Sequence, residues 1–319
     1  MANAPLWIRY HRDFDGICSG AILTHILREH RGERVMLRSV NYDQRDEWDS
    51  FSKNERFGVV DFHFHPRAEY WFDHHPTTFL TPELRAQYVP SDRWNWDENS
   101  PSCPPLIIRH AREHWGVEVE ERFHDMSRWS DIVDAARFES VEQALFGEEP
   151  ALRITRSLTA APAFDWTDVL AEALIEDSLG VVAERSDVEK AYEKSARNRD
   201  KALRQFPTTV ISIEDGVLLY DASSDKIRRE RFAAFYHHPE ISYCVGVIPT
   251  RAGYHVTAGE NPWNKPDPGV HVGELMEQYG GGGHRAVGGA NPKTLDATRA
   301  AAHEIADALR RGMTAGQGA

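Results

Sequence analysis

Three residues with metal-ligating side chains alternate near the N-terminus of this 319-residue chain: His11, Asp13 and Asp15, followed by Gly16. Hard divalent cations bind carboxylate oxygen, and ions such as Mn²⁺ also accept imidazole nitrogen. In an extended segment every second side chain points to the same face, so these three residues make a credible half of a metal site. The alternative is a polar loop in which Asp15 caps the following helix. This segment alone does not decide between the two.

A second polar group, Asp73-His74-His75, follows an aromatic run and precedes Pro76. Adjacent histidines arise by chance in a chain that contains 16 of them, so the pair alone is weak evidence. A carboxylate beside the pair strengthens the case for a metal site, although Asp73 would also serve simply as a hydrogen-bond acceptor for an imidazole. Asp61, which follows Val59 and Val60, adds a carboxylate that is suited to bridging two cations.

The apolar pattern predicts the elements that position these groups. Strands are predicted at residues 6–10, 35–40, 57–61 and 70–73, with a helix at 16–30. Strands that alternate with helices indicate βαβ units and a parallel sheet. In such sheets functional residues gather where strands end at the carboxyl edge, and the metal-ligating residues above all fall at strand ends.

The middle of the chain reads as a long loop at 82–105, a helix that begins near Leu106, and helices at 127–137 and 167–182. Residues 186–206 are highly charged with few apolar positions, which is typical of a solvated helix between two domains. We therefore predict a catalytic domain at 1–185, a linker helix at 186–207 and a smaller domain at 208–313.

The smaller domain is predicted to be α/β as well. Strands are expected at 210–213, 217–220, 243–248 and 254–258, with a turn at 214–216. Helices are expected at 227–236, 272–279 and 294–311, the last of them capped by Thr294.

A glycine run, Gly280 to Gly283, leads into His284 and Arg285. Glycine lets backbone N–H groups approach a phosphate without obstruction by a Cβ atom, and the two side chains add donors. The alternative is a flexible loop. Upstream, Trp263 is suited to stacking on a nucleobase, or else to packing against the domain core.

Composition narrows the classes of protein and substrate. The formal net charge of −13 argues against an extended nucleic-acid duplex and favours a short or small phosphorylated substrate. The three cysteines are far apart, which fits free thiols in a reducing cytoplasm. We find no export signal and no apolar stretch of the ~18 residues that crosses a bilayer, so we expect a cytoplasmic protein.

The order and spacing of these motifs resemble the DHH phosphoesterase superfamily. The matching features are His11-x-Asp13-x-Asp15-Gly16, Asp61, Asp73-His74-His75, and the glycine run from Gly281 to His284, which resembles that of the associated DHHA1 domain. The likeness extends from about Trp7 to Asn291. It implies an α/β fold in which an N-terminal parallel-sheet DHH domain is joined by a linker helix to a smaller DHHA1 domain with a mixed sheet.

The resemblance also implies a hydrolase with two divalent cations, Mn²⁺ foremost, with Mg²⁺ or Co²⁺ as alternatives. It assigns His11 and Asp13 to one cation, Asp15, His74 and Asp134 to the other, and Asp61 to both. His75 and Asp73 would be the catalytic pair, with His75 beside the phosphoryl group and Asp73 orienting an imidazole. Asp131 lies one helical turn from Asp134 and is the alternative ligand, but Asp134-Ala-Ala-Arg-Phe138 is similar to the segment in short-oligonucleotide members.

For the substrate, the resemblance implies contacts with the DHHA1 segment at the end remote from the cleaved bond. The predicted substrate-binding residues are Gly281, Gly282, Gly283, His284, Arg285 and Trp263. The leading hypothesis is a phosphodiesterase that acts on short single-stranded oligonucleotides or small nucleotides. The alternatives are a hydrolase of inorganic polyphosphate or pyrophosphate, and a catalytically degenerate nucleotide-binding protein. A homodimer is compatible with either enzyme.

Overall fold

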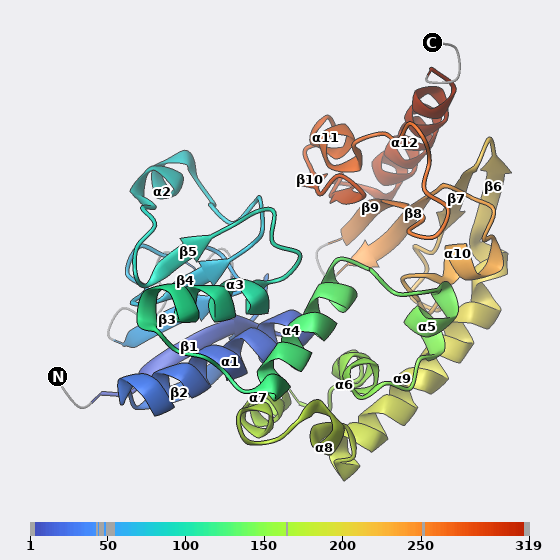
Figure 1. The fold of residues 1–319 in the computed structure, drawn as a ribbon. Helices are drawn as coiled ribbons and strands as arrows, with labels where there is room; N and C mark the ends of the chain where they lie inside the picture. Colours follow the sequence, from blue (N-terminus) through green and yellow to red (C-terminus); the bar gives the residue numbers. More distant parts are fainter. Residues whose placement is uncertain are drawn as a thin grey trace. The chain divides into compact units, whose positions relative to one another are not determined.

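The structure, a computed structural model, describes residues 4–42, 44, 48, 55–163, 165–250 and 253–315. The chain forms two compact units. The first comprises the chain up to Phe138 together with Gly147–Ser195, and the second comprises Glu139–Phe146 together with the chain from Ala196 onward. The boundary at Ser195 lies within helix α9 (Ser186–Gln205) (Figure 1). The domain limits predicted at residues 185 and 208 remain our proposal.

The first unit contains a sheet of five parallel strands in the order β2-β1-β3-β4-β5. The strands are β1 (Leu6–His11), β2 (Val35–Val40), β3 (Arg56–Val60), β4 (Trp71–Asp73) and β5 (Trp94–Trp96). From β1 the chain passes outward to β2 and then returns to β3 on the opposite side of β1. The carboxyl ends of β1 and β3 therefore flank a topological switch point, which is where open α/β sheets bind ligands.

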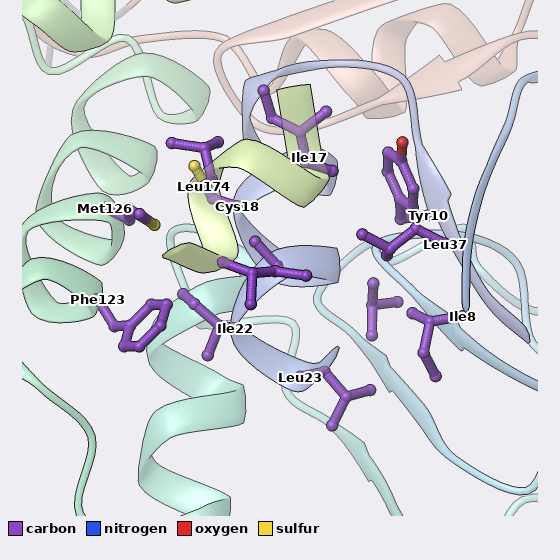
Figure 2. Packing of buried hydrophobic residues seen from close by; sticks show 14 of the residues in the cluster. Ile8, Tyr10, Ile17, Cys18, Ile22, Leu23, Leu37, Phe123, Met126 and Leu174 are labelled. Atoms are coloured by element: carbon purple, nitrogen blue, oxygen red, sulfur yellow. The ribbon is translucent and has the colours of Figure 1, made fainter. Parts of the chain in front are cut away.

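Helix α1 (Phe14–Arg31) connects β1 to β2 and lies in the core of this unit. Its apolar residues are buried on all sides, as expected for a helix covered by neighbours on every face. In Figure 2, Ile22 and Cys18 face Phe123 and Met126 of α4 (Glu121–Asp134), and Leu37 of β2 lies on the other side. Each buried Ile or Leu contributes about 1.5–3 kcal/mol relative to an exposed one, so this packing holds the N-terminus of α1 firmly at the sheet edge.

The cap of α1 differs from the sequence interpretation. Asp13, and not Asp15, is the N-cap, and its side chain accepts a hydrogen bond from the Gly16 amide at 2.9 Å. The helix ends at Gly32, whose φ of 64° is in the left-handed region that favours glycine.

Three predictions in the middle of the chain were wrong. The region 82–105 is not a continuous loop, because it contains helix α2 (Pro82–Gln87), strand β5 and the start of helix α3 (Cys103–His110). Strand β5 is not evident from the sequence because polar residues flank Trp94-Asn95-Trp96, and these three residues form a strand by pairing with β4. Helix α4 begins six residues earlier than predicted and ends at Asp134. The predicted helix 167–182 divides into α7 (Trp166–Glu176) and α8 (Leu179–Ala183), because Ser178 caps a new helix.

The first unit also contains α6 (Pro150–Leu158) and the π-helical turn Ala111–Trp115, which extends α3. The second unit also contains α5 (Val141–Phe146) and the 3₁₀ turn Phe206–Thr209, which follows α9. Within the described ranges, no helix is both long and apolar enough to cross a bilayer.

The second unit contains a six-stranded sheet in the order β10-β11-β9-β8-β7-β6. The sheet is mixed, as predicted for the smaller domain. Among the strands described for this unit, only β7 and β8 are parallel neighbours. The strands are β6 (Val210–Glu214), β7 (Val217–Asp221), β8 (Tyr243–Thr250), β9 (Gly253–Glu260), β10 (Gly282–Gly283) and β11 (Val287–Ala290). The predicted turn between β6 and β7 is confirmed, with Asp215 and Gly216 both at positive φ. Strands β10 and β11 had not been predicted.

Three α-helices accompany this sheet: α10 (Ala233–His237), α11 (Val272–Glu277) and α12 (Leu295–Ala315). The predicted cap of the last one is confirmed, because Thr294 Oγ1 accepts a hydrogen bond from the Ala297 amide at 3.2 Å. Helix α12 packs against β7, β8 and β9, and its buried side chains include Ile305 and Leu309. Helix α10 is shorter than the predicted 227–236 helix.

Candidate metal centre

Asp61 follows β3 at the switch point and is 1% exposed. Its φ of 54° is left-handed, which is uncommon for a residue other than glycine. The backbone is held there because the Asp61 amide donates to the Phe72 carbonyl at 2.9 Å. Neither carboxylate oxygen accepts a hydrogen bond from any residue that the structure describes. A buried carboxylate without such partners is costly, so Asp61 calls for a positive charge beside it.

Three imidazoles surround this carboxylate at distances longer than a hydrogen bond. His74 Nε2 lies 3.5 Å from Asp61 Oδ1, His75 Nδ1 lies 3.6 Å from the same atom, and His11 Nδ1 lies 3.9 Å from Oδ2. Asp61 thus stands at the centre of the residues that the two N-terminal motifs supply.

One ligand group consists of His11, Asp13 and Asp61, whose potential ligand atoms all lie within 4.8 Å of one another. His11 ends β1, and Asp13 uses Oδ1 to cap α1, so its Oδ2 faces His11 Nδ1 at 2.7 Å. Burial disfavours charge on His11, but the carboxylate of Asp13 raises the pKa of this imidazole. Burial likewise opposes ionisation of Asp13, yet His11 and the Gly16 amide hold the pKa of Asp13 below its usual range.

A second group consists of Asp15, His74 and Asp134, again within 4.8 Å of one another. A third group of the same kind, Asp61, Asp73, His74 and His75, shares a residue with each of these two. His74 Nε2 lies 3.3 Å from Asp15 Oδ2 and 3.6 Å from Asp134 Oδ2. On its other side, His74 Nδ1 lies 3.1 Å from the Ser100 carbonyl, which can only accept a hydrogen bond. The proton of neutral His74 therefore sits on Nδ1, and Nε2 presents a lone pair to the carboxylate side, as in histidine metal ligands.

Asp73 and His75 form a pair beside these groups. Asp73 is fully buried, and its Oδ1 lies 2.9 Å from His75 Nδ1 and also accepts the His74 amide at 2.9 Å. Asp73 therefore fixes the orientation of the His75 ring. Burial disfavours the imidazolium form of His75, but the charge of Asp73 and its hydrogen bond raise the pKa of His75.

The concentrated negative charge perturbs the remaining acids. Burial, followed by the charges of Asp15 and Asp13, raises the pKa of Asp61 well above its usual range. The same causes raise the pKa of Asp134 to about 7. His74 is disfavoured as a cation by burial, yet the hydrogen bond and charge of Asp15 raise its pKa to about 10. Carboxylates and imidazoles in this arrangement fit two divalent cations such as Mn²⁺, which would offset the repulsion among the acids.

The structure separates the two aspartates that the sequence left as alternatives on α4. Asp131 Oδ1 accepts a hydrogen bond from the Ser102 hydroxyl at 2.6 Å, and Asp131 belongs to none of the three ligand groups. Asp134, the last residue of α4, is the one whose carboxylate approaches His74.

Sequence reasoning missed several residues that support the centre. Ser100 orients His74 through its carbonyl, and the Cys103 amide donates to both oxygens of Asp15, at 3.0 and 3.3 Å. The rings of Tyr42 and Phe62 lie against His11, with centroids 4.8 and 6.0 Å away. Backbone contacts leave no trace in residue type, but Phe62, which directly follows Asp61, was a signal that sequence reasoning did not use.

The glycine run of the second unit has a different environment. Gly282 and Gly283 form β10 and pair with β11. The amides of Gly280, Gly281 and His284 donate to backbone carbonyls at 2.8–3.0 Å. A Cβ atom on Gly281 would lie 2.0 Å from the Gly289 carbonyl oxygen. Close packing of the hairpin therefore accounts for glycine at this position, and the three amides are not available to a phosphate.

The other predicted substrate contacts also lie in this unit. His284 and Arg285 are exposed at the tip of the β10–β11 hairpin. Trp263 is half-buried, and its ring contacts Phe232 and Phe235 edge-to-face, with centroids 5.5 and 6.4 Å away. This is the packing alternative considered for Trp263.

A scan against protein-family models finds no match to this sequence, and a search of curated proteins finds no relative. Solved structures, in contrast, are similar to it. A pGpG-specific phosphodiesterase from Vibrio cholerae is 18% identical with a TM-score of 0.67, and the likeness covers 98% of this chain and 99% of that protein.

Two further structures extend the comparison. The DHH domain of a protein described as a member of a ribosomal protein family is 13% identical with a TM-score of 0.57, covering 97% of this chain and 87% of that one. RecJ from Thermus thermophilus, solved in complex with Mn²⁺, is 12% identical with a TM-score of 0.57; the likeness covers 96% of this chain but only 52% of RecJ. The resemblance predicted from the motifs is thereby confirmed at the level of the fold, since this chain shares the α/β fold of these structures, one of which is described as a DHH domain.

Proposed function

We propose that this protein is a metal-dependent phosphoesterase that hydrolyses short oligonucleotides or small nucleotides. The observation that carries the proposal is the position of Asp61, a buried carboxylate with no hydrogen-bond partner among the described residues. It belongs to the ligand group of His11 and Asp13 and lies 3.5 Å from His74 of the Asp15–His74–Asp134 group. Without a ligand, burial of this carboxylate would lower the stability of the fold and have no structural explanation.

Within this proposal, His11 and Asp13 would hold one cation, Asp15, His74 and Asp134 would hold the other, and Asp61 would be available to both. Such cations would supply activation of a water nucleophile and would offset charge on the phosphoryl oxygens. The residues of the chain supply orientation: the Ser100 carbonyl fixes His74, and the helix cap fixes Asp13.

We propose that His75 donates a hydrogen bond to the phosphoryl group of the substrate. Asp73 favours its imidazolium form, and an imidazolium donates hydrogen bonds from both ring nitrogens. With Nδ1 directed to Asp73, the Nε2–H is the donor for a phosphoryl oxygen whose negative charge increases during the reaction.

The preference for a short nucleotide has two supports. The net charge of −13 is unsuited to a long nucleic acid. In addition, a protein with 18% identity and the same fold over nearly its whole length is a phosphodiesterase specific for pGpG, a dinucleotide. We propose that His284 and Arg285 contribute donors to the substrate, with the guanidinium matched to phosphate oxygens.

The test is a hydrolysis assay with Mn²⁺, Mg²⁺ or Co²⁺ against pGpG, cyclic dinucleotides, short RNA and DNA, 3′-phosphoadenosine 5′-phosphate and polyphosphate. We expect metal-dependent turnover of the short nucleotides, abolished by EDTA and restored by Mn²⁺. Turnover of polyphosphate without any nucleotide would replace the substrate assignment. The absence of saturable Mn²⁺ binding in calorimetry would overturn the enzymatic proposal as a whole and favour a degenerate binding protein.

A further inference from the structure

The segment Ser100–Cys103, at the start of α3, contacts two residues of the Asp15–His74–Asp134 group directly and is linked to the third through Asp131. The Ser100 carbonyl faces His74 Nδ1 at 3.1 Å, and the Cys103 amide donates to Asp15. Ser102 donates to Asp131, which lies one helical turn before Asp134. These three ligands come from α1, from the loop after β4 and from α4, so one short segment links three separate elements.

Ser102 does not perform the task usual for its position. It is the N-cap of α3, but the second and third residues of the helix are Pro104 and Pro105, which have no backbone N–H to donate to its hydroxyl. Its hydroxyl is fully buried and donates instead to Asp131 Oδ1 at 2.6 Å. The first amide of α3, that of Cys103, is satisfied by the carboxylate of Asp15. The Ser102 hydroxyl is therefore free of a capping role and serves Asp131, while the carboxylate of Asp15 accepts from the Cys103 amide.

The Ser102–Asp131 bond also constrains the position of α4. Asp134 is the final residue of that helix, and its side chain is 32% exposed, whereas those of Asp15 and His74 are 2% and 4% exposed. Helix ends fray, so Asp134 is the ligand of this group that most depends on an anchor. Asp131 provides that anchor one turn earlier, on the same face of the helix.

We propose that Ser102 and Asp131 are positioning residues that set the distance between Asp134 and its partners Asp15 and His74. They would thereby tune one of the two cation sites and leave the His11–Asp13–Asp61 group unaffected. The inference rests on the proposed two-cation function but assigns to Asp131 and Ser102 a role that the metal ligands themselves do not have.

The experiment measures Mn²⁺ binding by calorimetry in two backgrounds. In His11→Ala, the remaining binding reports the Asp15–His74–Asp134 group, and in His74→Ala it reports the other group. Adding Ser102→Ala is expected to weaken Mn²⁺ binding by up to about tenfold in the first background and to leave it unchanged in the second, since a single hydrogen bond is worth up to roughly that factor.

Two variants control for a structural effect. Asp131→Asn keeps an acceptor oxygen for the Ser102 hydroxyl, so it should bind Mn²⁺ like the parent, whereas Asp131→Ala should match Ser102→Ala. Ser130→Ala removes the neighbouring buried hydroxyl on α4 and should leave Mn²⁺ binding unchanged. If Ser102→Ala fails to fold by circular dichroism, the comparison of Asp131→Asn with Asp131→Ala decides.

The two proposals fail differently. Absence of Mn²⁺ binding to the parent protein would overturn the proposed function and this inference with it. If the parent binds two Mn²⁺ ions, the proposed function stands. The positioning role is then refuted if Ser102→Ala weakens Mn²⁺ binding equally in the His11→Ala and His74→Ala backgrounds, or weakens it in neither.

Discussion

The sequence pointed to phosphate chemistry in two places: the carboxyl edge of the first sheet, and the glycine hairpin of the second unit, residues 280–284 with β11. The two places differ in whether their polar groups have hydrogen-bond partners. At the sheet edge, both oxygens of Asp61 are buried without a hydrogen-bond partner among the described residues. In the hairpin, the amides of Gly280, Gly281 and His284 are satisfied by the backbone. Buried polar groups without hydrogen-bond partners indicate a ligand site, whereas groups that already bond to the backbone indicate a structural role.

The largest effect should come from the residue at the centre of this difference. We expect Asp61→Asn to abolish saturable Mn²⁺ binding and to lower kcat/KM by at least about a thousandfold, because removal of one donor that stabilises transition-state charge already costs about 10²–10³. Calorimetry and a steady-state assay would measure both.

The matched control is Asp168, a carboxylate whose Oδ1 accepts hydrogen bonds from Tyr10 Oη at 2.6 Å and from the Ser39 amide at 2.7 Å. In metal-free protein, Asp61→Asn should raise the midpoint of urea unfolding at neutral pH, since burial and the charges of Asp15 and Asp13 raise the pKa of Asp61 in the folded state and asparagine avoids that cost. Asp168→Asn should lower that midpoint and leave Mn²⁺ binding intact. A metal-free Asp61→Asn protein less stable than the parent would contradict the view that this carboxylate is held at a cost.

The second prediction concerns the hairpin. Gly281→Ala should destabilise the second unit by about 1–3 kcal/mol, because its Cβ would lie 2.0 Å from a backbone oxygen of Gly289, and overpacking typically costs that much. Gly282→Ala is the control, since nothing lies within 4 Å of a Cβ built there. Urea unfolding followed by circular dichroism would compare the two. Equal stability of both variants would refute the packing role, and a raised KM without instability would restore the anion-binding role of these amides.

The same contrast explains what the sequence could predict. His11, Asp13 and Asp15 were recognisable by residue type and spacing, and Asp61 and His74 through the resemblance. The predicted alternation along one extended strand end was wrong, because only His11 lies on β1, whereas Asp13 caps α1 and Asp15 lies within that helix. The Asp13 cap and the Ser102–Asp131 bond were not recognisable, because one depends on the exact start of α1 and the other joins residues 29 positions apart. Strand β5 was missed for a related reason: three residues with polar neighbours form a strand only when β4 lies beside them.

The smallest effect is expected at Arg285, on the exposed tip of the hairpin whose backbone is otherwise satisfied. Its carbonyl accepts the Val272 amide at 2.8 Å, so the tip is anchored to the first residue of α11 while the side chain stays exposed. Arg285→Ala should raise KM for a nucleotide substrate about three- to tenfold and leave both kcat and the unfolding midpoint unchanged, because an exposed cation contributes to binding of an anion more than to stability. Raising the salt concentration should shrink the difference in KM between parent and variant, since screening weakens the same interaction. Lys265→Ala provides the comparison with another exposed cation of this unit, and an equal rise in KM for both variants would indicate general charge attraction in place of a specific contact from Arg285.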